Sequence, residues 1–192
     1  SGGIAPQFSE IHPGYTDIYA DATTKYADEI TLAISDVTVD GTDVTFTVTV
    51  AGSAGDYTAA DVTPAVLIGL YGYDTKDFII NGHDRWDSNC NGTISRGDGD
   101  SPKGEFVFGE EEVAGCENPY WTVVDDEGPV YTITAHLEEW ADLITDGIVK
   151  NIELAALPET EDDVPLNAVD YTFSLVDEAE VAGFFGKNIV DV

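Results

Sequence analysis

The chain has 192 residues, of which 38 are acidic and seven are basic, so its formal net charge is −31. This length suits one domain with a sizeable core, and an apolar content of 43% argues against disorder. Seven scattered cations cannot supply the positive field that binds nucleic acids or anionic membrane surfaces. The negative surface favours a cation or a basic protein as partner, or salty water that screens its self-repulsion. A solubility adaptation to salt is the simplest explanation of the charge.

The chain begins with Ser1-Gly2-Gly3 and contains no methionine. We therefore expect an excised or processed piece of a larger protein, whose function belongs to the parent. No apolar run of about 18 residues is present, so the sequence predicts no membrane-spanning helix.

Residues 1–28 look like an irregular lead-in, and strand signals begin at Ile30. Apolar and polar residues alternate from there, and a change of phase before Val37 predicts a bulge or a bend. A hairpin turn at 40–43 should lead into a second alternating strand, which the small residues of 51–55 should break.

The following segments also have strand patterns, as short alternating or apolar runs bounded by turn residues: 65–71, 105–108, 120–124, 130–137, 148–157 and 169–176. The first of them is continuously apolar, which predicts a central strand covered on both faces. Residues 138–144 are the one plausible helix, and 158–165 should form an acidic turn. The Gly-, Asp- and Asn-rich stretch 81–117 should form a long excursion, and 177–192 a tail or linker.

Seven or eight short strands with one helical turn predict a single all-β domain over residues 29–176. The expected architecture is a Greek-key β-sandwich or split β-barrel, with 81–117 as a calcium-binding, disulfide-closed loop. An immunoglobulin-like sandwich is the alternative.

The strongest local motif is DSNCNGTISRGD at residues 87–98, which matches the calcium loop D-x-[DN]-x-[DN]-G through six positions. Oxygen ligands are expected at loop positions 1, 3, 5, 7, 9 and 12: Asp87, Asn89, Asn91, Thr93, Ser95 and Asp98. Gly92 should make the sharp turn, and Ile94 should point into the core. The aspartate at position 12 resembles the loops of dockerin modules more than those of calmodulin-like sensors. The flanking helices of a true EF-hand are missing, since Gly and Asp surround the loop on both sides. We expect bound Ca²⁺ here, the alternative being a solvated Asp/Asn turn.

The two cysteines, Cys90 and Cys116, both lie in loop-like surroundings. In an acidic domain of secreted type we expect them to form a disulfide, the alternative being two reduced thiols in a cytosolic protein. No Cys-x-x-Cys is present, which excludes the usual zinc and thioredoxin-type motifs.

Catalytic motifs are poor. The histidines His12, His83 and His136 lie far apart, and no nucleophile–base motif accompanies them. We expect His136 at the surface of its strand. His83 precedes the calcium loop, and we expect it near the bound ion without being one of its ligands. No Gly-rich loop opens a helix, so nucleotide binding is not predicted. We therefore expect no enzymatic activity from the domain itself.

Several sequence segments resemble the haem-free β-domains of outer-surface multihaem c-type cytochromes of the decahaem OmcA/MtrC type: 10–15, 25–28, 34–37, 70–78 and 166–169. In that family, Greek-key split β-barrels alternate with domains that carry Cys-x-x-Cys-His haem sites, and one barrel carries a disulfide. The resemblance implies that Cys90 and Cys116 form that bridge, at a wider spacing. It also implies that His12 is a remnant of a segment supplying axial haem ligands, the alternative being a His-Pro-Gly turn.

This chain contains no Cys-x-x-Cys-His. The resemblance therefore implies a non-catalytic structural and docking domain of an extracellular electron-transfer cytochrome at the outer cell surface, which binds Ca²⁺ and no haem itself. Haem c is expected in flanking domains of the parent. The expected partners are those haem-bearing domains, with other surface redox proteins or mineral. A calcium-stabilised adhesin or surface-layer β-module is the alternative from another functional class.

Overall fold

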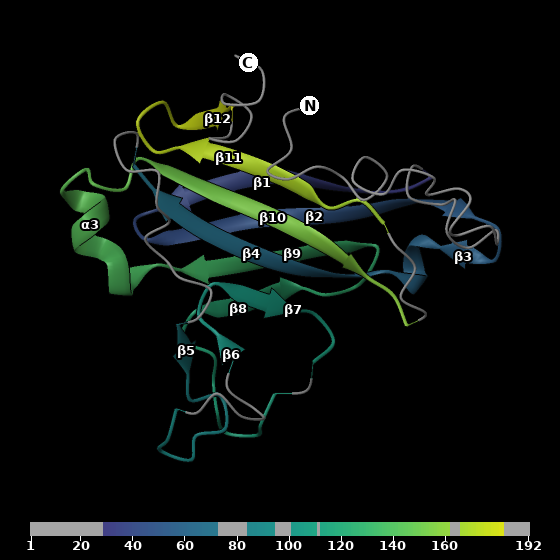
Figure 1. The fold of residues 1–192 in the computed structure, drawn as a ribbon, viewed down its shortest axis with the longest axis horizontal. Coiled ribbons are helices and arrows are strands. Elements are labelled where there is room, and N and C mark those ends of the chain that lie inside the picture. Colours follow the sequence, from purple (N-terminus) through teal and green to yellow (C-terminus); the bar gives the residue numbers. More distant parts are fainter. Residues whose placement is uncertain (1–28, 73–83, 95–100, 111, 162–165, 183–192) are drawn as a thin grey trace, which may run out of the picture.

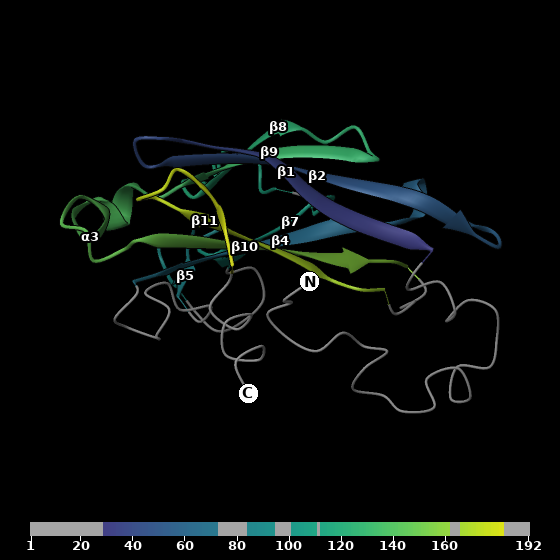
Figure 2. The same ribbon diagram turned by 90° about the horizontal axis from the view of Figure 1, so that it is seen from above.

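The computed structural model describes residues 29–72, 84–94, 101–110, 112–161 and 166–182. Two antiparallel sheets lie face to face as a β-sandwich, and Figure 2 shows them as two layers. A small two-stranded sheet projects beyond one side of the sandwich in Figure 1. The predicted all-β sandwich is confirmed, and the described residues form no closed barrel.

The first sheet has the strand order β1-β2-β9-β8, with β3 pairing with the end of β2. Its strands are β1 (Ile30–Asp40), β2 (Asp43–Ala54), β3 (Tyr57–Thr58), β8 (Trp121–Asp125) and β9 (Val130–His136). The second sheet has the order β12-β11-β10-β4-β7. Its strands are β4 (Thr63–Tyr71), β7 (Glu105–Val107), β10 (Asn151–Glu159), β11 (Val169–Ser174) and β12 (Ala179–Val181). Far apart in the sequence, β4 and β10 pair at its centre.

The remaining elements are short. The two-stranded sheet consists of β5 (Arg85–Trp86) and β6 (Ser101–Pro102). The helical turns are η2 (Ala59–Asp61), η3 (Glu138–Trp140) and α3 (Ala141–Thr145). The predicted helix at 138–144 is therefore confirmed as a 3₁₀ turn that runs into a short α-helix. Within the described ranges, no helix combines the length and apolar character needed to cross a membrane.

In β2, which lies between β1 and β9 in the first sheet, apolar and hydroxyl side chains alternate. Val44, Phe46, Val48 and Val50 are at most 1% exposed, because every second side chain of a strand points to the same face. Between them, threonines point outward. The β1–β2 hairpin turns where predicted, since Asp40 pairs with Asp43.

The change of phase in β1 is a bulge, as predicted. The register against β2 shifts between Ser35 and Thr38, and Asp36 between them has a φ of 52°. One extra residue in β1 brings Val37 and Val39 back toward the core.

Three predicted boundaries are wrong. The segment 51–55 does not break β2, which continues to Ala54. At Gly52 the strand has a φ of 99°, and a Cβ there would collide with the carbonyl oxygen of Glu29, so only glycine lets the two strands approach so closely.

The acidic turn predicted for 158–165 starts too early, because β10 continues to Glu159. Pro158 lies opposite Pro64 of β4. Neither residue has an N–H to donate, so the two prolines can face each other in the ladder and the strand continues. The predicted tail 177–192 contains β12, which pairs with β11 and so extends the second sheet.

Aliphatic and aromatic side chains fill the space between the sheets. A chain of ring contacts runs through it: Phe46–Trp121 at 6.4 Å, Phe106–Trp121 at 6.1 Å, Phe106–Phe108 at 5.1 Å and Phe108–Tyr131 at 4.9 Å between centroids. Trp121 belongs to β8 and Phe106 to β7, so these rings join the two sheets at the edge from which the excursion leaves.

Candidate functional site

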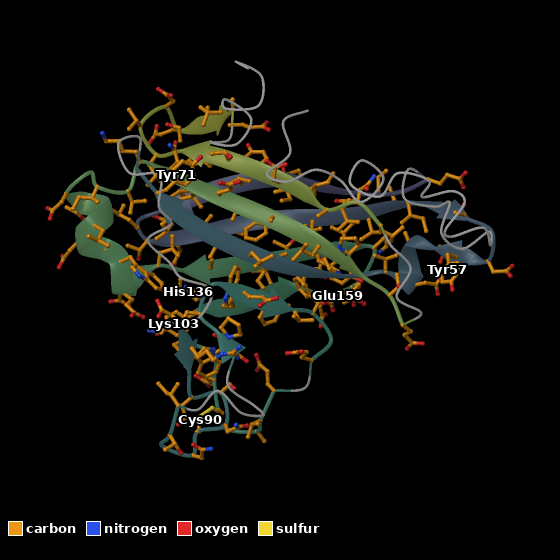
Figure 3. The ribbon with its side chains drawn as sticks, in the orientation of Figure 1. Tyr57, Tyr71, Cys90, Lys103, His136 and Glu159 are labelled. Atoms are coloured by element: carbon orange, nitrogen blue, oxygen red, sulfur yellow. A yellow bond between two sulfur atoms is a disulfide. The ribbon has the colours of Figure 1, made fainter. Side chains whose placement is uncertain are left out.

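The excursion forms a separate lobe, which we define as the described residues 84–94, 101–103 and 112–118. Its β5–β6 hairpin is closed by the bond from the Lys103 N–H to the Asp84 carbonyl oxygen at 2.9 Å. Figure 3 shows Cys90 at the far end of the lobe and Lys103 near its junction with the sandwich.

The first half of the predicted calcium loop curls around the Asp87 carboxylate. Asp87 Oδ1 accepts from the Asn91 N–H at 3.1 Å, and Oδ2 accepts from the Gly92 N–H at 2.7 Å. Asn91 Oδ1 in turn accepts from the Thr93 N–H and the Thr93 hydroxyl, both at 2.8 Å. Gly92 has a φ of 84°. The turn predicted from the motif is present, and it holds the oxygens of positions 1 and 5 in fixed orientations.

Asp87, Asn89, Asn91 and Thr93 therefore lie on one turn at the surface, whereas Ser95 and Asp98 lie outside the described residues. Among the described side chains, no three His, Cys, Asp or Glu residues converge as metal ligands. A cation at this turn must therefore use amide, hydroxyl and main-chain oxygens beside Asp87, which are ligands that Ca²⁺ accepts.

The prediction for Ile94 is wrong. This side chain is 63% exposed instead of pointing into a core. The described part of the lobe has hairpin strands and turns where an EF-hand has flanking helices, so no helix pair is present to bury it.

The disulfide between Cys90 and Cys116 is confirmed, with a Cα–Cα distance of 5.6 Å. It links the turn around Asp87 to the segment that leads into β8. Cys116 is 4% exposed, so the bridge lies partly inside the lobe.

A polar clamp, formed by Lys103, Tyr120 and Glu139, joins the lobe to the sandwich. The Lys103 ammonium donates to both carboxylate oxygens of Glu139, at 2.8 and 3.1 Å, and lies 5.4 Å from the centroid of the Tyr120 ring. The Tyr120 hydroxyl donates to Glu139 Oε2 at 2.6 Å. Below the clamp, Trp121 Nε1 donates to the Lys103 carbonyl oxygen at 2.9 Å.

The clamp shifts the pKa of each of its members. The bonds from Lys103 and then Tyr120 lower the pKa of Glu139 below its ordinary value of 4.5. Burial acts to lower the pKa of Lys103, but the bonds to Glu139 and Tyr120 outweigh it, so that pKa is raised. Burial, followed by the bond to Glu139, raises the pKa of Tyr120. At neutral pH the clamp is therefore a charged pair with a neutral phenol.

An open hollow of about 470 Å³ lies between the lobe and β7. Its lining includes the carboxylates of Glu105, Glu110 and Glu112 beside Arg85 and Trp86. With three carboxylates against one guanidinium, the hollow suits a basic or cationic group better than an anion.

The structure also contains an acid–base–hydroxyl row that the sequence analysis missed. His136 Nδ1 lies 2.8 Å from Asp43 Oδ1, and His136 Nε2 lies 2.6 Å from Thr122 Oγ1. These residues are far apart in sequence, and only the pairing of β2, β9 and β8 brings them together. The prediction that His136 lies at the surface of its strand is confirmed, because its side chain is 30% exposed.

This row is the end of a longer ladder on the outer face of the first sheet. Thr45 bonds Thr134 at 2.8 Å, and Thr47 bonds Thr132 at 3.1 Å, from the same two strands. Cross-strand hydroxyl pairs of this kind stabilise a sheet. The ladder therefore favours a structural role for His136 over a catalytic one. His12 and His83, the other two histidines, lie outside the described residues.

No family model matches the chain, and no curated protein sequence does. Solved structures that match it include MtrC from Shewanella baltica OS185, at 12% identity and a TM-score of 0.38, and the outer membrane decaheme cytochrome OmcA, at 10% identity and a TM-score of 0.32. The matches cover 80% and 79% of this chain, and it spans only 23% of each of those proteins. Both are proteins of the type that the sequence resembles. The superpositions are loose.

Proposed function

We propose that the chain is a non-catalytic structural and docking domain of an extracellular multihaem electron-transfer cytochrome, and that it carries no haem of its own. The observation that carries the proposal is the Cys90–Cys116 disulfide. A c-type haem is attached through free thiols, and both cysteines of this chain are bonded to each other. In the proposed parent polypeptide, flanking domains carry the haem.

The disulfide also supports the proposed extracellular location. Such bridges persist in oxidising compartments such as the cell surface. A net charge of −31 favours solubility in salty water and favours basic partner surfaces. The filled interior of the sandwich supports a rigid spacer that orients its neighbours, since the large core side chains are almost fully excluded from solvent.

Docking can be tested with the full chain labelled with ¹⁵N and mixed with the haem-bearing segment that flanks it in the parent. The oxidised haem irons are paramagnetic. Amide resonances of the surface that contacts the haem-bearing segment should therefore broaden, while those of the opposite surface stay sharp. A haem-free globular protein of the same net charge as that segment is the control. Absent or uniform broadening would overturn the docking role and favour the adhesin or surface-layer alternative. A haem absorption band that survives denaturation of the purified chain would overturn the haem-free assignment.

We further propose that the loop 87–98 binds one Ca²⁺. The support is the turn around Asp87, which orients the oxygens of Asp87 and Asn91 while leaving lone pairs on the carboxylate for a metal. Binding to the folded state alone adds about 2.7 kcal/mol at a hundredfold excess over the dissociation constant. Calcium should therefore raise the melting temperature of the chelator-treated protein.

Calorimetric titration of Asp87→Ala against wild type tests the site. The variant should lose the heat of calcium binding at this loop. The reason is that the carboxylate at loop position 1 is the ligand for which water is the poorest substitute. Asp56→Ala, which removes one exposed carboxylate from the β2–β3 turn, is the matched control and should titrate like wild type. Equal binding by Asp87→Ala and wild type would show that the loop is an ordinary acidic turn.

A further inference from the structure

Four polar or charged side chains are buried among the described residues: Asn151, Glu153, Thr172 and Ser174, each at most 3% exposed. The β10–β11 register places Asn151 opposite Ser174 and Glu153 opposite Thr172. These are two neighbouring cross-strand pairs on one face of the second sheet. Ile152 and Leu154 alternate with them and point into the core, so the four polar side chains lie on the outer face.

Four oxygen atoms of this group have no hydrogen-bond partner within the described part of the chain: both carboxylate oxygens of Glu153, Oδ1 of Asn151 and Oγ1 of Thr172. The fourth residue differs, because Ser174 Oγ accepts from the Asp177 N–H at 3.0 Å. A buried polar atom without a partner costs about 1 to 3 kcal/mol, and a buried charge costs more. Such a group is therefore expected to have a ligand.

The first sheet shows that strand pairing alone does not leave such atoms unsatisfied. Its outward cross-strand pairs Thr45–Thr134 and Thr47–Thr132 bond each other directly. Asp43 is likewise bonded to His136, which stands opposite it. On the second sheet, Glu153 and Thr172 are also opposite each other, yet no bond joins their side chains.

The orphan atoms are oxygens, and three of the four are acceptors only. Asp170, two residues from Thr172 on the same face of β11, adds a second carboxylate, and its charge acts on Glu153. Burial raises the pKa of Glu153 to about 7, with the charge of Asp170 adding to the rise. Above that pH both carboxylates are charged, and this group of oxygen acceptors then lacks a positive ligand.

We propose that Glu153, Asn151 and Thr172 form a second cation site, on the outer face of β10 and β11, which takes Ca²⁺. Both Glu153 oxygens, the Asn151 amide oxygen and the Thr172 hydroxyl are hard ligands of the kinds that Ca²⁺ uses, and its six to eight positions leave room for water. The charge of the ion balances those of Glu153 and Asp170. The site shares no residue with the loop 87–98, so it stands or falls independently of the loop.

The experiment is a calorimetric titration of the full chain with CaCl₂ at pH 8 after chelator treatment, in an Asp87→Ala background that removes the proposed loop site. One Ca²⁺ should bind per chain, and calcium should raise the melting temperature. Adding Glu153→Gln should abolish both effects, because the amide is nearly isosteric but neutral. Glu159→Gln, an exposed glutamate on the same strand, is the matched control and should change neither.

Unchanged calcium binding in Asp87→Ala/Glu153→Gln overturns the second site, as does absence of calcium binding in Asp87→Ala. If NaCl stabilises the Asp87→Ala protein at constant ionic strength while CaCl₂ does not, the divalent assignment is wrong. Thr172→Val in the same background removes one ligand without removing charge, so it should weaken binding yet leave it measurable. A normal far-ultraviolet spectrum of each variant excludes unfolding as the cause. Loss of the loop site alone leaves these outcomes unchanged, so the two proposals fail separately.

Discussion

The sandwich and the lobe of this protein are stabilised by different interactions. In the sandwich, Phe46, Ile133 and Leu154 are completely excluded from solvent, and burial of apolar area supplies the stabilisation. In the lobe, Arg85, Trp86 and Asp87 remain partly exposed, and order comes from the disulfide, the hairpin bonds and the clamp. A segment with too few apolar residues for a core of its own can still be ordered when covalent and polar links constrain it.

The difference predicts that core and lobe respond to mutation on different scales. Phe46→Ala removes a fully buried ring that contacts Trp121, and it should cost about 3 to 5 kcal/mol of unfolding free energy. Urea denaturation followed by tryptophan fluorescence measures this cost. Phe46→Leu is the graded control, and it should lower the unfolding free energy by less than about 1.5 kcal/mol relative to wild type. A cost below 1 kcal/mol for Phe46→Ala would show that the interior is not tightly packed.

Removal of the disulfide should act mainly on the lobe. For a sequence separation of 26, chain entropy sets the contribution of the bridge at about 3.5 kcal/mol. The double variant Cys90→Ser/Cys116→Ser should therefore become sensitive to protease in the lobe, while the amides of β2 and β10 keep their protection. Hydrogen exchange with mass spectrometry, beside limited proteolysis, separates the two regions. Equal loss of protection in β2 would mean that lobe and sandwich unfold as one unit. That result would contradict the view that different interactions stabilise them.

The sandwich was largely predictable because its signals are local. The alternation in Val44–Val50 and the phase change before Val37 depend only on the strand period of two, which one sequence displays. The errors occur where a non-local contact overrides a local signal. Gly52 suggests a break, yet its pairing with Ile30 carries β2 onward, and Pro158 suggests a turn until Pro64 is known to lie opposite.

The candidate sites were only partly predictable for the same reason. The turn around Asp87 follows from a continuous motif, and the disulfide from there being only two cysteines. By contrast, the His136 row and the Glu153 group depend on strand register, which no single strand encodes. In the sequence, Glu153 is simply the polar residue of an alternating strand, and such a residue is expected to face solvent.

The clamp gives the smallest expected effect and the sharpest test of how tightly the lobe is joined to the sandwich. The Glu139 side chain is 44% exposed, so its pair with Lys103 should contribute only about 0.2 to 1 kcal/mol. A double-mutant cycle of Lys103→Met and Glu139→Gln measures this coupling, and Glu138→Gln, the exposed neighbour, is the control that should show none.

The pH dependence of this coupling has a definite sign. Because the pKa of Glu139 is lowered in the folded state, its stabilisation is complete above the ordinary value of 4.5 and is lost as the pH falls through the lowered value. Because the pKa of Lys103 is raised, its part holds below 10.5 and is lost as the pH rises through the raised value. The coupling energy should therefore be constant between about pH 5 and 10 and vanish below the lowered pKa of Glu139. Protease sensitivity of the lobe should rise in the same acidic range, while a coupling that persists at pH 2 would show that packing on Tyr120, rather than charge, joins lobe and sandwich.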